Sequence, residues 1–193
     1  MQTTVRSVHN LISALQPLDD LEGDHRADTL SWIASTDDIF RRAKPATPPR
    51  HLVSYIVVVD PTDLSVFLVD HINAGRWLPT GGHVEPDEHP TEAARREIRE
   101  ELGVDADFSI AGSEPLFLTV TTTVGVDNGH IDVSLWYVGA ANRDTEFILD
   151  PDEFRGGRWW TVNEVLDSDP RRFDPHFPRF IEKLRSMVSA KSA

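Results

Sequence analysis

The stretch GGHVEPDEHPTEAARREIREELGV, residues 81–104, decides the fold of this 193-residue chain. It opens with a glycine pair and a polar loop, and its second half has the composition of a helix. Pro90 suits the first helical turn and Gly103 the position just past the last one, so we expect a helix over Pro90–Leu102. The apolar stripe that anchors this helix to the core is then formed by Ala94, Ile98 and Leu102.

Three carboxylates of the same helix gather on one side of it. Glu97 and Glu101 are four residues apart and Glu100 lies between them, so all three fall within an arc of about 100°. Carboxylates this close stay ionised only at a cost unless a cation lies among them, and Mg²⁺ is usually held by a few carboxylates plus substrate phosphates. For an arbitrary charged helix, the alternative is a solvated acidic face balanced by its arginines.

The spacing of the whole stretch decides between these two interpretations. Residues 82–104 fit the pattern G-x5-E-x7-R-E-U-x-E-E-x-G-U, where U is aliphatic, at every constrained position. This pattern is the Nudix box, and the chain therefore resembles the Nudix hydrolases (MutT-like). Two positions depart from the usual family sequence, because His89 stands where a better capping residue is common and Thr80 precedes the glycine pair.

The resemblance implies a role for each box residue. Glu97, Glu100 and Glu101 would be catalytic metal ligands, and the backbone carbonyl of Gly81 would be a further ligand. The structural positions of the box are Gly82, Glu88, Arg96 and Gly103, with Glu88 and Arg96 paired. Many family members take one more carboxylate from a late loop, and here we expect Glu153 to act as metal ligand or general base. An ordinary polar turn is the alternative for that loop.

The rest of the chain predicts an α/β fold in which helices pack against a mixed β-sheet, plus an N-terminal helical extension. The resemblance implies that this fold is a Nudix-type α/β/α sandwich. Apolar or alternating segments predict strands at residues 52–60, 65–72, 115–125, 130–141 and 157–162. A capping box at residues 161–164 starts a short helix, and an amphipathic helix closes the chain. Helical periodicity also predicts helices near the N-terminus, at residues 5–15 and 24–35, and a short one at 37–42.

A change of composition divides the chain into three parts. We expect an N-terminal helical extension over residues 1–43, a Pro-rich linker over 44–50 and a Nudix hydrolase domain over 51–193. The extension is expected to cap the sheet, and a homodimer surface or a shield for the pocket are the alternatives. The N-terminus lacks the apolar core of a signal peptide and no run is long enough to span a bilayer, so we expect a cytoplasmic protein.

Charge and composition exclude some classes of binding partner and of metal site. The formal net charge of −13 argues against duplex nucleic acid and against an anionic membrane surface, because both need clustered basic residues. The absence of cysteine excludes thiolate metal sites and a cysteine nucleophile. The eight histidines are scattered, without the spacing typical of a zinc site.

Weaker signals suggest residues for substrate binding. Residues 130–137 alternate, so that His130, Asp132 and Trp136 share one face, which is either the lining of a substrate pocket or the solvated face of a strand. Arg76 precedes the box loop and is suited to a phosphate. The downstream proline and tyrosine that mark the ADP-ribose and dinucleoside-polyphosphate subclasses are not matched by Pro115 or by residues 120–122.

The sequence thus predicts a Nudix pyrophosphohydrolase that uses Mg²⁺, with Mn²⁺ as the alternative cofactor. It would cleave a phosphoanhydride bond in a nucleoside diphosphate-linked substrate, a nucleoside triphosphate (oxidised forms included) or related nucleotide, by in-line attack of water. A non-catalytic Nudix-type module that binds a nucleotide or sugar nucleotide is the competing hypothesis.

Overall fold

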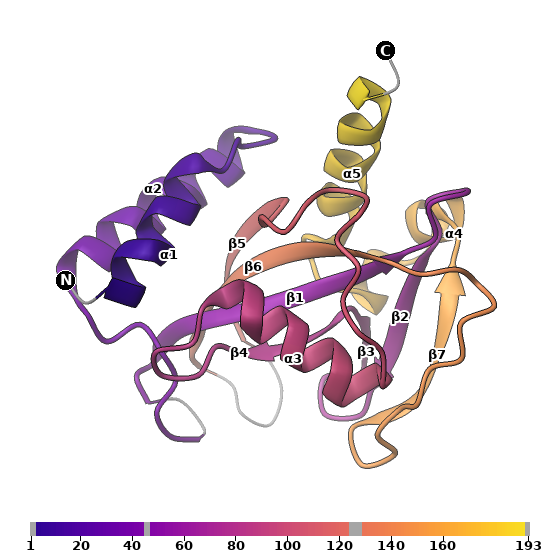
Figure 1. Ribbon diagram of the computed structural model, residues 1–193, viewed down its shortest axis with the longest axis horizontal. Helices are drawn as coiled ribbons and strands as arrows, with labels where there is room; N and C mark the ends of the chain where they lie inside the picture. The colour runs from indigo at the N-terminus through magenta and orange to yellow at the C-terminus, as the bar shows by residue number, and fades with distance from the viewer. Residues whose placement is uncertain (1–2, 45–46, 124–128, 192–193) are drawn as a thin grey trace.

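The computed structural model describes residues 3–44, 47–123 and 129–191, and within them a mixed seven-stranded sheet forms the centre (Figure 1). The expected linker at 44–50 and strand at 115–125 lie partly outside these residues. The strands are β1 Arg50–Val59, β2 Val66–His71, β3 Arg76–Leu78, β4 Thr80–His83, β5 Phe117–Thr122, β6 Ile131–Ala140 and β7 Phe154–Trp160. Their order is β3-β2-β1-β6-β5, with β4 also paired to β1 and β7 to β2.

The pairing of β1 with β6 is parallel, whereas the other named strand pairs are antiparallel. β1 is buried on both faces, as its nearly continuous apolar sequence requires. It pairs with β2 near its end and with β4 in its middle. The strand that contains the glycine pair is therefore held directly against the central strand of the sheet.

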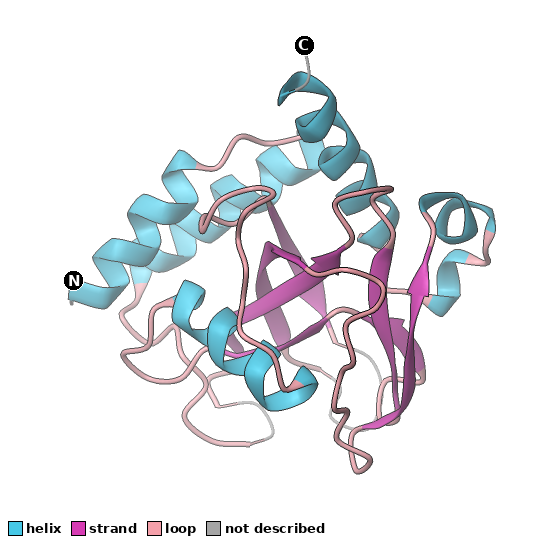
Figure 2. Cartoon of the chain, turned by 45° about the vertical axis from the view of Figure 1, so that its right-hand side comes forward, coloured by secondary structure: helices cyan, strands magenta, loops and turns pink. Residues whose placement is uncertain are grey.

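Helices cover both faces of the sheet, which confirms the α/β/α sandwich (Figure 2). On one face, α3 (Pro90–Leu102) buries Ala94, Ile98 and Leu102 against Ile56 and its neighbours. On the other, α5 (Phe177–Lys191) buries four apolar side chains against Val57 and Val59 of the same strand. The alternation of side chains along β1 thus divides the core into two layers. The capping box opens α4 (Val162–Asp167), which η1 (Pro170–Arg172) follows.

Two helices before the sheet, α1 (Thr3–Ala14) and α2 (Asp20–Ser35), form a hairpin that covers the edge strand β5 (Figure 1). Strand edges expose unpaired N–H groups, and α2 satisfies two of them here. The amide of Leu118 donates to Glu22 at 3.1 Å, and that of Val120 donates to the Nδ1 of His25 at 3.4 Å. This contact agrees with the expectation that the extension caps the sheet.

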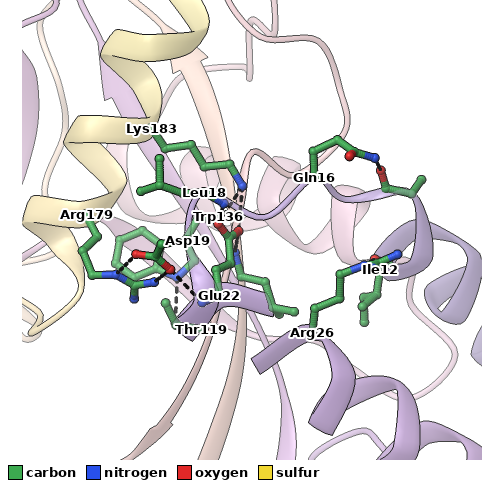
Figure 3. Close-up of polar contacts among 12 residues, drawn as sticks. Ile12, Gln16, Leu18, Asp19, Glu22, Arg26, Thr119, Trp136, Arg179 and Lys183 are labelled. Carbon is green, nitrogen blue, oxygen red and sulfur yellow. Dashed lines mark hydrogen bonds and ion pairs between the residues drawn. The ribbon is translucent and has the colours of Figure 1, made fainter. Parts of the chain in front are cut away.

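A buried ion pair fixes the hairpin to the C-terminal helix (Figure 3). The ammonium of Lys183 lies 2.7 Å and 2.8 Å from the two carboxylate oxygens of Glu22, which is fully buried. Glu22 also accepts the amide of Leu18 at 2.6 Å. At the rim, Arg179 forms an ion pair with Asp19, the N-cap of α2. The carboxylate of Glu22 is therefore the polar centre of this contact.

The structure corrects several local predictions. Residues 37–42 form no helix, because Ile39 and Phe40 enter the core in an irregular segment whose Ile39 carbonyl accepts the amide of Leu52 at 2.9 Å. α2 begins four residues earlier than expected, because Asp19 caps it. The short strands β3 and β4 were not predicted, since neither carries an apolar pattern.

Within the described ranges 3–44, 47–123 and 129–191, no helix combines the length and the apolar character that crossing a membrane would require.

Candidate functional site

The carboxylates of α3 meet the glycine pair of β4. The carboxylate of Glu101 accepts the amide of Gly81 at 3.0 Å, and a Cβ at Gly82 would overlap the carboxylate of Glu97. Gly81 has φ +147°, and a Cβ there would overlap the carbonyl oxygen of Ser54. Only glycine allows this approach of strand and helix. The glycine pair therefore brings backbone and carboxylates together.

The electrostatics around Glu97 and Glu101 favour the binding of a positive charge. Burial raises the pKa of Glu101 to about 9, and the neighbouring Glu97 carboxylate acts in the same direction. Burial also raises the pKa of Glu97, although its ion pair with Arg96 opposes the shift. Two buried carboxylates with raised pKa values side by side are stabilised when a cation joins them. The donor set thus fits a divalent metal ion with oxygen ligands.

The third expected ligand occupies a different environment. The side chain of Glu100 is 60% exposed and accepts a hydrogen bond from Arg96 at 3.2 Å. It lies on the same arc of α3 as the two buried carboxylates, at the solvent side. Glu100 is therefore placed to complete the ligand set from outside the pocket.

Arg96 braces the loop between β4 and α3. Its guanidinium donates to both carboxylate oxygens of Glu88, each at 3.0 Å, and to the carbonyl of His83 at 3.1 Å. It also donates to Glu97 at 2.7 Å. The carboxylate of Glu88 is the main cause that raises the pKa of Arg96 above its usual range. One guanidinium thus joins the loop, the strand end and a candidate metal ligand.

Glu153 comes from the turn before β7, next to the end of β2. Its carbonyl accepts the amide of Ile72 at 2.9 Å, and its own amide donates to the carbonyl of Asp150 at 3.2 Å. The negative charge of Glu153 is one of the causes that raise the pKa of Glu101. The late loop therefore brings a further carboxylate into the field of the α3 cluster, from a distant part of the sequence.

The NUDIX domain family model matches residues 49–184 of the chain, which is most of its length. The chain belongs to the Nudix family. Among curated relatives, it is 28% identical over 120 residues to an NAD-capped RNA hydrolase of Caenorhabditis elegans, covering 60% of this chain and 29% of that protein. It is 33% identical over 94 residues to isopentenyl-diphosphate delta-isomerase 2 of Aromatoleum aromaticum, covering 48% of this chain and 47% of that protein. The chain thus spans less than half the length of these two relatives.

Solved structures confirm the fold. The Nudix domain of Shewanella oneidensis NrtR, solved with ADP ribose, superposes with a TM-score of 0.55 at 19% identity, covering 71% of this chain and 87% of that one. A Nudix-family hydrolase from Clostridium perfringens superposes with a TM-score of 0.52 at 20% identity, covering 73% and 97%. At these identities the agreement concerns the Nudix fold alone.

The sheet face opposite α3 presents a second polar group in this Nudix domain. A bridge between Trp77 and Phe173 joins β3 to the residue that precedes Asp174. Burial raises the pKa of Asp174 to about 6 and the charge of Asp132 acts in the same direction, whereas the positive charge of Arg76 opposes the shift. Burial raises the pKa of Tyr55 too, with contributions from both aspartates. The charges of Arg76 and Asp132 therefore act on the buried carboxyl of Asp174, and Asp174 and Tyr55 are residues that the sequence analysis did not select.

Replacement of Asp174 by Asn should change how stability depends on pH. The pKa of Asp174 is about 6 in the folded chain and 3.8 in the unfolded one. Its stabilising contribution is thus complete below pH 3.8 and is lost as the pH rises through 6. The asparagine side chain cannot ionise, so the D174N protein should gain up to about 3 kcal/mol over the wild type at pH 8, with little difference near pH 4.

Urea unfolding of both proteins at several pH values, in EDTA, measures this difference. Asp167→Asn, at the exposed end of α4, is the control and should follow the wild-type curve. Parallel curves for wild type and D174N between pH 4 and 8 would show that Asp174 ionises normally.

The structure corrects one expected substrate contact. The ring of Trp136 is fully buried between the sheet and α5, and its Nε1 donates to the hydroxyl of Thr119 at 2.9 Å. It stacks on Phe180 at 5.5 Å between ring centroids. No face of the ring is left for a nucleobase, so Trp136 is a core residue. The alternation predicted its side of the strand but not the helix that covers that side.

A basic cavity adjoins the carboxylates on the other side. A space of about 340 Å³ lies beside Glu97 and His83 and is also lined by Arg41, Arg42 and Lys44. These side chains come from the segment that follows α2, before β1. The cluster RRAK at 41–44 is the sequence signal that identifies them, although only the fold places them next to the box. The extension thus contributes to the site as well as to the sheet edge.

Proposed function

We propose that this Nudix domain hydrolyses a phosphoanhydride bond in a nucleoside diphosphate-linked substrate, with Mg²⁺ or Mn²⁺ as cofactor. The observation that carries the proposal is the meeting of Glu97 and Glu101 with the glycine pair, where burial raises the pKa of both carboxylates. Two buried carboxylates with raised pKa values held against each other are typical of a functional site that binds a cation.

The side chains around the glycine pair would have separate tasks. Glu97, Glu100, Glu101 and the carbonyl of Gly81 would hold the divalent ions. Bound there, such ions would neutralise phosphate oxygens and acidify the attacking water. Glu153 would accept the proton of that water as general base. Glu88 and Arg96 would keep the loop and Glu97 in place.

The substrate class follows from the charges around the carboxylates. Arg41, Arg42 and Lys44 line the cavity beside Glu97 and suit the phosphates of an anionic substrate. Arg76, at the start of β3, would contact another polar part of the substrate. A nucleoside triphosphate (oxidised forms included) or a related nucleotide meets these needs. The relative named as an NAD-capped RNA hydrolase supports a nucleotide with a pyrophosphate bridge.

A non-catalytic nucleotide or sugar-nucleotide binding module is the second candidate. The Nudix domain solved with ADP ribose motivates it, through fold alone. The intact box at residues 82–104 favours turnover over binding.

A substrate panel with Mg²⁺ tests the proposal. We expect phosphoanhydride hydrolysis of at least one member among nucleoside triphosphates, oxidised nucleotides, ADP-ribose, sugar nucleotides and dinucleoside polyphosphates, resolved by ion exchange. Activity should fall to background in EDTA and return with excess Mg²⁺, because the carboxylates need the cation to bind phosphate. Tight binding of one compound without product would favour the binding module instead.

A further inference from the structure

Three histidines and one aspartate, far apart in the sequence, converge at one end of three adjacent strands. His51 lies at the start of β1 and His83 ends β4. His130 immediately precedes β6, and Asp132 is the second residue of that strand. The register places His51 opposite Asp132 and places His83 opposite Val53, on the same face of the sheet. One ligand atom from each of the four lies within 4.8 Å of every other. We refer to these residues as the His–Asp cluster.

The hydrogen bonds of two histidines leave their Nε2 lone pairs directed at the centre of the cluster. Nδ1 of His51 lies 2.8 Å from the carbonyl oxygen of Pro48, which can only accept, so Nδ1 carries the proton. Nδ1 of His130 lies 3.1 Å from the hydroxyl of Thr123, which donates to the His130 carbonyl at 3.2 Å. That hydroxyl therefore accepts from Nδ1. A ring whose Nδ1 donates in this way can offer the lone pair of its Nε2 to a metal ion.

The atoms at the centre have no hydrogen-bond partners. His51 is fully buried. Among the residues that the structure describes, three buried atoms of the cluster have no hydrogen-bond partner: Nε2 of His51, Nε2 of His83 and Oδ1 of Asp132. Yet Oδ1 of Asp132 lies 3.3 Å from Nε2 of both His51 and His130. Lone pairs facing each other at this distance repel unless a cation lies between them.

We propose that His51, His83, His130 and Asp132 bind a divalent transition-metal ion, with Zn²⁺ the best match. In a tetrahedral site with bonds of about 2.0–2.1 Å, neighbouring ligand atoms are separated by about 3.3 Å, as they are around Asp132. Three imidazole nitrogens favour zinc and its neighbours over Mg²⁺ or Ca²⁺, which prefer all-oxygen ligands. The bond from Nδ1 of His51 to a backbone carbonyl is the usual support of a metal-bound imidazole.

This site is distinct from the carboxylates of α3 but linked to them. His83 follows Gly81 and Gly82 on β4, and its carbonyl accepts the guanidinium of Arg96 that also holds Glu97. A metal ion bound to the cluster would join β4, β1 and β6 at the end of β4 that follows the glycine pair. The ion would thereby fix the position of β4. In this proposal His130 and Asp132 bind a metal ion and not the substrate.

Metal binding by the full chain tests the proposal without reference to activity. Protein stripped with a chelator and then given Zn²⁺ should retain one ion per chain after dialysis, by elemental analysis. Zinc absorption-edge spectroscopy should show imidazole ligands, and Co²⁺ in place of Zn²⁺ should give the visible bands of a tetrahedral site. Free Zn²⁺ at about 100 times its dissociation constant should raise the Tm by about 5–10 °C.

Variants separate this site from other cation sites. His130→Ala and Asp132→Asn should each weaken Zn²⁺ binding by at least about tenfold. Loss of a residue that only hydrogen-bonds to a metal ligand already costs about that much affinity, and these two residues would bind the ion directly. His9→Ala, on α1, should leave it unchanged, as should Glu101→Gln on α3. Circular dichroism checks that each variant folds. The absorption-edge spectrum of the wild-type protein tests the imidazole ligands independently of the variants. No retained Zn²⁺, or Zn²⁺ without imidazole ligands, or equal binding by H130A, D132N and H9A would overturn the proposal.

Discussion

Replacement of Glu101 by Gln should abolish most of the hydrolytic activity while leaving the fold intact. The amide oxygen of the glutamine can still accept the N–H of Gly81, which lies 3.0 Å from the native carboxylate, but it offers a metal ion no negative charge. Loss of several kcal/mol of charge stabilisation in the transition state lowers kcat by roughly 10²-fold or more. Steady-state kinetics on the substrate identified by the panel measure this loss.

Stability distinguishes this loss from misfolding. The pKa of Glu101 is about 9 in the folded chain without a cation and 4.5 in the unfolded one. The folded state therefore loses stability relative to the unfolded state as the pH rises from 4.5 to 9. E101Q should therefore be at least as stable as the wild type in EDTA at pH 8, and it should gain less from added Mg²⁺. The control Glu92→Gln, exposed on the same helix, should keep wild-type activity. Activity of E101Q within threefold of the wild type would remove Glu101 from the catalytic set.

Truncation of Glu22 to Ala should cost the protein about 3–5 kcal/mol in free energy of unfolding. The ammonium of Lys183, which is only 9% exposed, would lose the carboxylate that it contacts through both oxygens. The amides of Leu18 and Leu118 would lose their acceptor at the same time. Urea unfolding followed by circular dichroism and tryptophan fluorescence measures the change, and the two signals should shift together.

A surface ion pair provides the matched comparison. Asp38 pairs with Arg42 at 2.7 Å, with both side chains largely in solvent, so Asp38→Ala should leave the free energy of unfolding close to that of the wild type. A loss in E22A no larger than in D38A would show that the helical hairpin is held by its apolar contacts alone. The early loss of only one of the two signals would instead mean that the hairpin detaches before the sheet unfolds.

Local patterns were enough to predict the helix that carries the carboxylates of the candidate site. The helix over Pro90–Leu102 has the predicted bounds, since proline at its start and glycine after its end act through the backbone. Glu97 and Glu101 meet because residues four apart share a helix face. The link from Glu101 to Gly81 also lies within one continuous stretch of sequence, so a single motif carries both partners.

Other parts depended on how distant segments pack. Trp136 lies on the side of β6 that alternation predicts, but the phenylalanines of α5 cover that side and bury its ring. The strand β4 has a sequence dominated by glycine and gains its structure from pairing with β1. Strand propensity could not identify β4, because its glycines let the strand lie close to the helix and do not bury apolar side chains.

By itself, the sequence determined the Nudix box, its helix and the two-layered alternation of the strands, because each depends on residues within a few turns or pleats of one another. Only the tertiary structure decided that three scattered histidines and Asp132 converge. Their positions show no ligand spacing along the chain, and the register of β1 with β4 and β6 supplies it instead. Strand pairing joins residues at any separation in sequence, so a site built across strands leaves no periodic trace in the sequence.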